Sequence, residues 1–222
     1  MSNDTIVQYD PDLRHHFEEP EQQHEAATLG MWTFLITEVM FFGGLFVAYT
    51  LYRSLYPEAF ASTSQYMDVI LGGVNTGVLI CSSLTMVLAV RAARMGQNRM
   101  VALFLVATMI LGLVFLGIKG IEYHHKWVEH LVPGFNFRYD ETQFAHHAQI
   151  LFFLYFLMTG MHAVHMIVGE AMLAVLVVMA LRGRFRPSWN TPVDMVGLYW
   201  HFVDIVWIFL FPLLYLIGKH HL

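Results

Sequence analysis

Cysteine and charged residues are scarce in this sequence. Cys81 is the only cysteine among 222 residues, which excludes an internal disulfide framework and a multi-thiolate metal site. Because Cys81 lies inside an apolar run, we expect it to be a buried, unreactive thiol. Charged residues make up 13% of the chain, whereas soluble domains usually contain about 25%. The composition of this chain therefore differs from that of most soluble proteins.

Several motifs that identify enzymes or cofactor proteins are also missing. The sequence contains no Cys-x-x-Cys-His haem attachment motif and no glycine-rich phosphate-binding loop. It shows no serine or cysteine constellation typical of nucleophilic catalysis. Its net charge of −5 carries little information, because most charges should lie in loops. We expect no nucleic-acid partner.

Apolar residues dominate what is present. They form 57% of the sequence, and the mean hydropathy is +0.53. A membrane-spanning helix needs about 20 predominantly apolar residues. Five segments meet this requirement, at about 29–52, 67–90, 100–123, 144–181 and 193–217. The sequence therefore predicts an all-α integral membrane protein, with one membrane domain over 29–222 after a polar, acidic N-terminal arm over 1–28.

The short connections between spans predict how the chain is oriented in the membrane. The connections RAARMGQNR and RGRFRPSWN each contain three arginines and no acidic residue. The other two connections are mixed or acidic. Positively charged loops stay in the cytoplasm. We therefore expect a cytoplasmic N-terminus and a C-terminus on the periplasmic, outer side.

Glu38 is an unusual residue for the apolar segment LGMWTFLITEVMFFGGLFVAY. If the helix begins near Leu29, Glu38 lies about 14 Å along it, close to the bilayer midplane. Exposing an ionised carboxylate to lipid at this depth costs roughly a few kcal/mol of free energy or more. Two interpretations remain open. Glu38 could exchange protons or gate a pathway, or it could be a neutral carboxyl hydrogen-bonded to a neighbouring helix.

Polar side chains also occur inside the last two spans. His162 and His165 are three residues apart and share a helix face, but Glu170 points to one side and no third ligand joins them. We therefore expect interhelical hydrogen bonding and no metal site. Asp204 needs a partner, which could be His201 on the same face, or His162 or His165. Such a pair could carry protons or simply tie helices together.

Glu122 follows Lys119 near the outer end of the third span, in GIKGIEYHHKW. The spacing of three residues predicts an ion pair at the membrane interface. With His162, His165, His201 and Asp204, Glu122 forms the set of groups that we expect to build a polar network between helices.

Two self-contained functions fit these intramembrane groups. A membrane cytochrome could bind one haem between two of the three histidines of the last two spans. A small proton-coupled transporter could use Glu38 and Asp204, although no internal repeat supports it. Buried polar groups without a recognisable reaction centre instead favour a subunit of a larger complex.

Four segments resemble subunit III of haem–copper respiratory oxidases, in its five-span bacterial form. LGMWTFLITEVMFFGGLF is similar to the family's Ser-Glu helix, with Thr37 in place of serine, and FLGIKGIEY resembles its GxEY helix end. TGMHAVHMIVGEAML resembles the TGxHGxHVxxG helix, with Ala163 where glycine is common. YWHFVDIVWIFLFPLLYL is similar to the closing helix almost residue for residue. The resemblance covers about residues 29–217.

The resemblance implies an accessory, non-catalytic role in a bacterial aa3-type terminal oxidase. This chain would hold no haem or copper, both of which belong to partner subunits. Its main contact would be subunit I, within a complex that also contains subunit II and small subunits. It would support proton uptake and the stability of subunit I in the cytoplasmic (inner) membrane. A respiratory supercomplex is a further assembly that the resemblance allows.

The resemblance also implies an arrangement and a lipid site. Spans one and two would form one arm of a V, and the remaining three spans would form the other arm. The V-shaped cleft between the two arms would bind phospholipids. Glu38 matches the family's carbodiimide-reactive glutamate in that cleft, and Arg182 matches a position that reaches lipid phosphate. Arg184 is a second head-group candidate. Glu38 favours cytochrome c as the electron donor, and subunit III of a quinol oxidase is the alternative.

Overall fold

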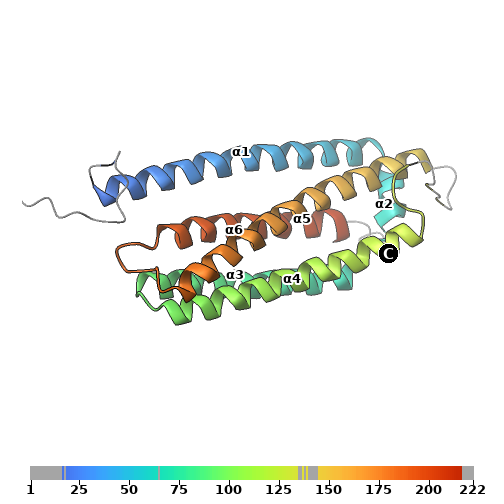
Figure 1. Ribbon diagram of the computed structural model, residues 1–222. Coiled ribbons are helices and arrows are strands. Elements are labelled where there is room, and N and C mark those ends of the chain that lie inside the picture. The colour runs from blue at the N-terminus through green and yellow to red at the C-terminus, as the bar shows by residue number, and fades with distance from the viewer. Residues whose placement is uncertain are drawn as a thin grey trace, which may run out of the picture.

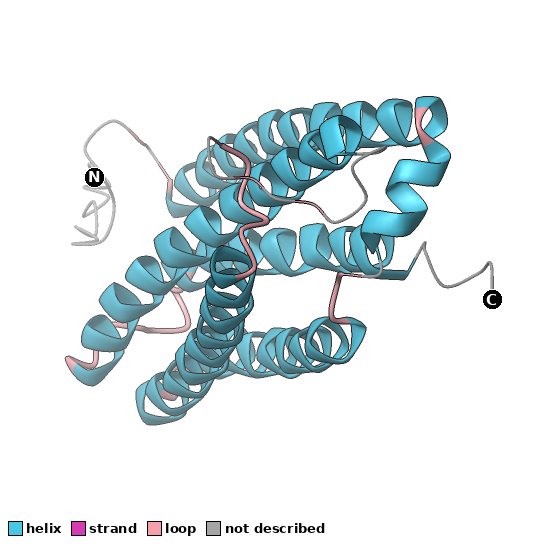
Figure 2. Cartoon of the chain, turned by 90° about the vertical axis from the view of Figure 1, so that its right-hand side faces the viewer, coloured by secondary structure: helices cyan, strands magenta, loops and turns pink. Residues whose placement is uncertain are grey.

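The computed structural model describes residues 17, 19–64, 66–134, 137, 139 and 145–216. Most of the predicted N-terminal arm, residues 1–16 and 18, and the last six residues lie outside this described part. Helices are the only long regular elements among the described residues (Figures 1 and 2).

The chain forms six α-helices followed by one π-helical turn. Their bounds are α1 Pro20–Leu55, α2 Pro57–Ser64, α3 Val69–Arg94, α4 Asn98–Val128, α5 Ala145–Leu181, α6 Thr191–Phe211 and η1 Pro212–Leu216. By length and apolar composition, α1, α3, α4, α5 and the continuous α6–η1 segment can each cross a membrane. The five-span, all-α prediction is confirmed.

Local sequence explains where these helices begin and end. Pro20 starts α1, where its missing N–H costs no hydrogen bond. Asp68 caps α3 by accepting hydrogen bonds from the backbone N–H groups of Ile70 and Leu71. Gly96 follows α3 with a φ of +70°, a left-handed conformation that suits glycine at a helix end.

α6 lies at the centre of one bundle. It packs against α1, α3 and α5, while α4 packs against α3 and α5 (Figure 1). The two-plus-three V is not confirmed, because α3 packs on α4 and α6 instead of forming a separate arm with α1. α1 contacts the bundle through a narrow stripe in which Leu35, Phe42 and Tyr49 are buried.

Two tryptophans of α6 fill the middle of the bundle. Trp200 and Trp207 are fully buried. The indole N–H of Trp200 donates to Ser82 Oγ at 2.9 Å, and that of Trp207 donates to Thr76 Oγ1 at 3.1 Å. Both acceptors belong to α3, so these bonds fix α6 against α3 without leaving a buried donor unpaired.

Cys81 differs from its predicted environment. Its side chain is exposed on α3 instead of buried. An apolar run in a soluble protein would face the core, but a membrane helix is apolar on the side that faces lipid as well. Hydropathy alone therefore did not distinguish the two sides of α3.

The arginine-rich connections lie at one end of the bundle. The turn after α3 and the connection between α5 and α6 lie at the same end as the start of α1, at the left of Figure 1. α2 and the segment after α4 lie at the opposite end. Each span reverses the direction of the chain, so successive connections lie at alternate ends of the bundle. The two arginine-rich connections therefore lie at the same end, as the charge pattern of the connections requires.

Candidate functional site

A carboxyl–imidazole pair joins α1 to α5. Glu38 Oε2 lies 3.1 Å from His165 Nε2. The two side chains keep 20% and 14% of their surface exposed, so the pair sits at the edge of the packed interior. Glu38 therefore has the neighbouring-helix partner that a carboxyl at this depth needs.

The surroundings of His165 hold its ring in one orientation. Nδ1 lies 2.8 Å from the backbone carbonyl oxygen of Met161, one turn earlier in α5. Phe42 contacts the ring edge-on with 5.3 Å between centroids, and Tyr199 stacks on it at 6.4 Å. The hydroxyl of Tyr199 also donates to the backbone carbonyl of His165 at 3.0 Å. The imidazole is thus fixed by contacts from α1, α5 and α6.

His162 lies in a different environment from His165. It is 1% exposed, and neither ring nitrogen has a hydrogen-bond partner among the described residues. Its ring contacts Phe115 at 5.4 Å and Trp207 at 5.3 Å between centroids. The two histidines share a helix face in the sequence pattern but have separate neighbours. The described residues include no cluster of three His, Cys, Asp or Glu side chains that could hold a metal ion.

A second polar cluster is buried between α4, α5 and η1. Lys119 Nζ lies 3.0 Å from Glu122 Oε2, and both side chains are less than 5% exposed. The hydroxyls of Tyr155 and Tyr215 donate to Glu122 Oε1 at 2.7 and 2.6 Å. Lys119 also donates to both tyrosine hydroxyls. The predicted ion pair at a spacing of three residues is present, and it is buried within the protein.

Sequence reasoning missed the two tyrosines of this Lys119–Glu122 cluster. Tyr155 and Tyr215 lie 33 and 93 positions from Glu122, so no local pattern connects them. A usable signal was Lys119 itself, a cation inside the apolar run FLGIKGIEY, because a buried ammonium needs several acceptors or aromatic faces. Its Nζ lies 5.1 Å from the ring centroid of Tyr155 and 5.3 Å from that of Trp207.

Asp204 forms no hydrogen bond with any of the three histidines that the sequence offered as its partner. His201 Nδ1 lies 2.8 Å from Ser83 Oγ on α3. The Asp204 carboxyl is buried, and neither of its oxygens has a hydrogen-bond partner among the described residues. His162 and His165 do not reach it either. His201 and Asp204 share a helix face, but the His201 imidazole forms its hydrogen bond with the Ser83 hydroxyl on α3.

Glu170 is a further buried carboxyl that the sequence analysis set aside. It lies between α5 and α4, where its carboxyl occupies the space that a Cβ at Gly112 would need. Both of its oxygens are buried without a partner among the described residues. Glu170 and Asp204 are therefore two intramembrane carboxyls left unpaired within the described chain, an arrangement that is costly unless something else pairs them.

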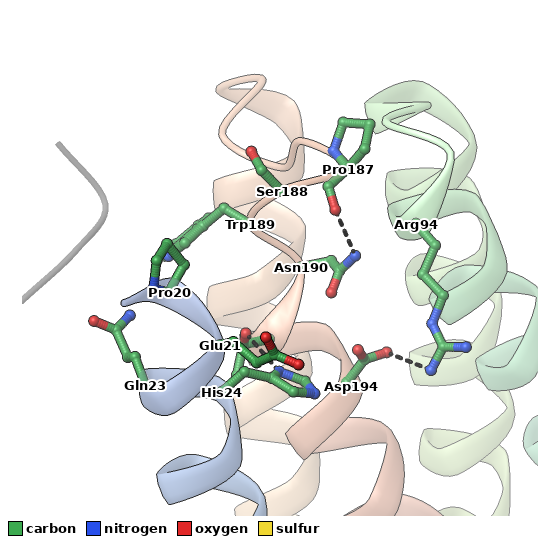
Figure 3. Close-up of a pocket in the computed structure, with 11 residues that line it drawn as sticks. Pro20, Glu21, Gln23, His24, Arg94, Pro187, Ser188, Trp189, Asn190 and Asp194 are labelled. Carbon is green, nitrogen blue, oxygen red and sulfur yellow. Dashed lines mark hydrogen bonds and ion pairs between the residues drawn. The ribbon is translucent and has the colours of Figure 1, made fainter. Parts of the chain in front are cut away.

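A polar pocket of about 400 Å³ lies at the end of the bundle near the start of α1 (Figure 3). His24 Nδ1 lies 3.1 Å from Thr191 Oγ1, and Arg94 forms a 3.3 Å ion pair with Asp194. A neighbouring pocket shares His24, Arg94 and Asp194 and reaches His201. A third, mostly apolar one continues from His201 to Asp204 between α3 and α6. Together these pockets form a furrow along α6.

Arg182 and Arg184 are exposed at the end of α5. Neither arginine lines the furrow pockets. Both lie at the end of the bundle that holds the polar pocket, in the connection that leads to α6. They are accessible to a ligand in solution or at a membrane surface.

The protonatable groups of this site have different chemical capacities. The Glu122 carboxyl accepts hydrogen bonds from one ammonium and two phenol hydroxyls. The Glu38 carboxyl instead faces a single imidazole nitrogen, His165 Nε2. The three intramembrane histidines contact different neighbours: Ser83 for His201, Glu38 for His165 and Trp207 for His162.

Comparisons with known proteins agree with the residue-based resemblance. The family model of cytochrome c oxidase subunit III matches residues 15–219. A Thermostichus vulcanus protein named cytochrome c oxidase subunit 3 is 32% identical over 192 residues, or 86% of this chain and 87% of that protein. A Synechocystis protein of the same name is 31% identical over 219 residues, or 98% and 85%. A Staphylococcus aureus protein named probable quinol oxidase subunit 3 is 28% identical over 195 residues, or 87% and 90%.

The match extends over both polar clusters and all five apolar helices. The chain therefore belongs to the cytochrome c oxidase subunit III family and is a multi-pass membrane protein of an oxidase complex.

Proposed function

We propose that this chain is an accessory, non-catalytic subunit of a bacterial aa3-type terminal oxidase. Oxygen reduction, haem and copper would then belong to partner subunits, with subunit I as the main contact and subunit II and small subunits in the same complex. The observation that carries the proposal is the family match over residues 15–219.

A role in proton uptake follows from Glu38. Its carboxyl lies within hydrogen-bonding distance of an imidazole and keeps 20% of its side chain exposed. A proton can therefore be exchanged there without unpacking the bundle. In the complex, this chain would support proton supply to subunit I and prolong the activity of that subunit during turnover.

Phospholipid binding is part of the same proposal. Arg182 and Arg184 are exposed at the end of the bundle that the loop charges assign to the cytoplasm. Guanidinium groups at a bilayer surface bind lipid phosphates by charge-assisted hydrogen bonds. The N-terminus would face the cytoplasm of a bacterium, and the C-terminus the outer side of its inner membrane.

A second candidate is subunit III of a quinol oxidase. The Staphylococcus aureus relative has this name and is 28% identical, only slightly less than the two relatives named as cytochrome c oxidase subunits. We favour cytochrome c as the donor because those two relatives are the more similar, and because Glu38 occupies the family's glutamate position. The two candidates share the accessory role and differ in subunit II.

Affinity purification in mild detergent tests the proposed function. A tagged chain extracted from its native membrane should bring an oxidase subunit I and subunit II with it, in equal amounts. Mass spectrometry of the eluted bands identifies them, and subunit II distinguishes the two candidate donors. A transporter or an independent cytochrome would instead elute as this chain alone.

Replacing Asp204 with alanine should weaken the retention of this chain in the complex without destabilising the chain itself. The carboxyl is buried and unpaired within the described chain, so its removal eliminates a desolvation cost instead of a hydrogen bond. Retention is measured as the amount of this chain left on immobilised oxidase after washes of increasing detergent strength. Asp204→Asn, which keeps an acceptor, should be retained better than the alanine variant. Equal retention of all three proteins through the harshest wash would contradict a role in assembly.

A further inference from the structure

We propose that the furrow along α6 binds an isoprenoid quinol, whose ring lies between α3 and α6 and whose hydroxyl groups bond to His201 and Asp204. This ligand site is additional to the accessory role and does not depend on which electron donor the complex uses. Only binding is proposed, with no electron transfer. The furrow, two polar side chains at its inner end and their depth in the span support this assignment.

The furrow is large enough for a small molecule and is mostly apolar at its inner end. Its two pockets near the start of α1 have volumes of about 400 and 420 Å³. The pocket between α3 and α6 has a volume of about 510 Å³. Small-molecule sites in proteins typically have roughly 300–1,000 Å³. His201 lines the second and the third pocket, so the furrow continues past it to Asp204.

His201 offers one ring nitrogen to a ligand. Its Nδ1 lies 2.8 Å from Ser83 Oγ, so a hydrogen bond with α3 holds the imidazole ring in place. Among the described residues no hydrogen bond involves Nε2, and the side chain is only half-buried. A neutral imidazole nitrogen either donates or accepts, depending on the tautomer. Nε2 can therefore bond to a hydroxyl group, which is both a donor and an acceptor.

Asp204 supplies the second polar group of the site. It lines the pocket between α3 and α6 and is 4% exposed. Neither carboxyl oxygen has a hydrogen-bond partner among the described residues. A buried polar group normally has a partner, and a carboxyl oxygen accepts a hydrogen bond in both of its protonation states. The ligand that fits Asp204 therefore brings a hydrogen-bond donor.

The depth of His201 and Asp204 limits the class of ligand. α6 and η1 form a span of 26 residues that begins at Thr191. His201 and Asp204 lie about 15 and 20 Å along it, at about 1.5 Å per residue. Both lie within a hydrocarbon core that is about 30 Å thick. A phospholipid has its polar head at the membrane surface, and its acyl chains cannot donate a hydrogen bond. The ligand must instead have a compact polar head that enters the hydrocarbon core.

Branched side chains at the rim of the furrow favour a flat ring over a partner helix. The rim residues are all exposed and line the inner pocket: Ile80, Leu84, Val87, Ile205 and Ile208. Helices pack closely in membranes where the contact residues are small, which these are not. A planar ring can enter between such side chains, and an isoprenoid chain can lie along them. A quinol combines a planar ring, two hydroxyl donors and such a chain.

The other intramembrane polar groups do not offer an equivalent site. Glu38 and His165 contact each other, and the Glu122 carboxyl accepts three hydrogen bonds from its neighbours. His162 and Glu170 have no hydrogen-bond partner among the described residues, but neither lines a pocket of the furrow. The inner end of the furrow is therefore where unpaired polar groups and a cavity coincide.

Binding of a quinol and of its dimethyl ether to the purified complex tests the assignment. The probe is a quinol with a chain of two prenyl units, and the ether has the same ring and chain without the hydroxyl donors. We expect the complex to bind the quinol about ten times more tightly than the ether. His201→Phe should weaken quinol binding about tenfold and leave ether binding unchanged. Cys81→Ser is the matched control on α3, because Cys81 is exposed and lines no pocket of the furrow.

A photoreactive quinol with a diazirine on its chain locates the site in the unaltered complex. Mass spectrometry should find the label on residues 80–87 of α3 and 201–208 of α6. Excess quinol should prevent this labelling, whereas excess dimethyl ether should not.

Several results would overturn the assignment. Equal affinities for the quinol and the ether would show that the hydroxyl groups make no contact, and an equal loss of binding in Cys81→Ser would show that His201 is not specific. Label only on other helices or on partner subunits would place the quinol elsewhere. Competition by phosphatidylethanolamine as strong as by the quinol would show that the furrow binds acyl chains. Recovery of the oxidase subunits with the tagged chain tests the accessory role separately, so the two failures are distinguishable.

Discussion

Replacing Glu122 with leucine should lower the free energy of unfolding by about 3–5 kcal/mol. The substitution leaves the Lys119 ammonium buried, with only phenol oxygens and aromatic faces as partners. An uncompensated buried charge is among the few single changes with so large an effect. Denaturant or thermal unfolding of the purified chain in mild detergent measures the loss.

A double variant separates the lost charge pair from lost packing. Lys119→Met with Glu122→Leu removes both charges, and we expect it to be more stable than Glu122→Leu alone. Arg94→Gln is the control, because it breaks the exposed ion pair with Asp194 and should cost at most about 1 kcal/mol. If the single and double variants lose the same stability, the ion pair is not the reason why Glu122 matters.

Replacing Gly169 with alanine should destabilise the bundle by about 1–3 kcal/mol. A Cβ at this position would lie 2.8 and 2.9 Å from two ring carbons of Trp200. Trp200 is fully buried and is fixed by its hydrogen bond to Ser82, so the ring has no room to withdraw. α5 and α6 would have to separate. The unfolding measurement used for Glu122→Leu gives the size of the effect.

Gly160 offers a matched control on the same helix. A Cβ there would meet nothing closer than the Tyr123 hydroxyl at 3.8 Å, an ordinary contact. Gly160→Ala should therefore leave stability unchanged or raise it by about 0.5–1 kcal/mol, because alanine favours the helix. Equal losses for the two alanine variants would show that close packing of α5 on Trp200 is not what requires glycine at position 169.

Hydropathy and helix spacing predicted the features that depend on one helix at a time. The five spans follow from the length of the apolar runs, because a bilayer fixes how many residues a helix needs. The Lys119–Glu122 contact follows from a spacing of three residues on one helix. The choice of Glu38 as an intramembrane group needing a partner was likewise local.

Features that depend on which helix lies opposite could not be predicted from these patterns. His165 is 127 positions from Glu38 in the sequence, and no periodic pattern predicts that α1 contacts α5 at these two residues. Spacing placed His201 and Asp204 on one face but did not show that Ser83 of α3 would lie against His201. A membrane helix is also apolar on its lipid side, so the exposure of Cys81 left no trace in the sequence.

The predicted V-shaped arrangement shows the same limit at the level of the whole fold. It assigned spans one and two to a separate arm, whereas α3 packs on α4 and α6. Small residues on α3, such as Gly72, permit close helix packing, but they do not indicate which helix packs against α3. At Gly72 the partner is Phe211, from the end of α6.

The most direct test of the accessory role is a reduced-minus-oxidised optical spectrum, recorded on two preparations of this chain. The first is the tagged chain purified with everything that it retains from its native membrane. The second is the same chain after stripping from its partners. The account predicts haem bands in the first preparation, which follow subunit I through the stripping step, and no haem bands in the second. Haem bands that stay with the stripped chain, or a chain that purifies alone from its native membrane, would contradict it.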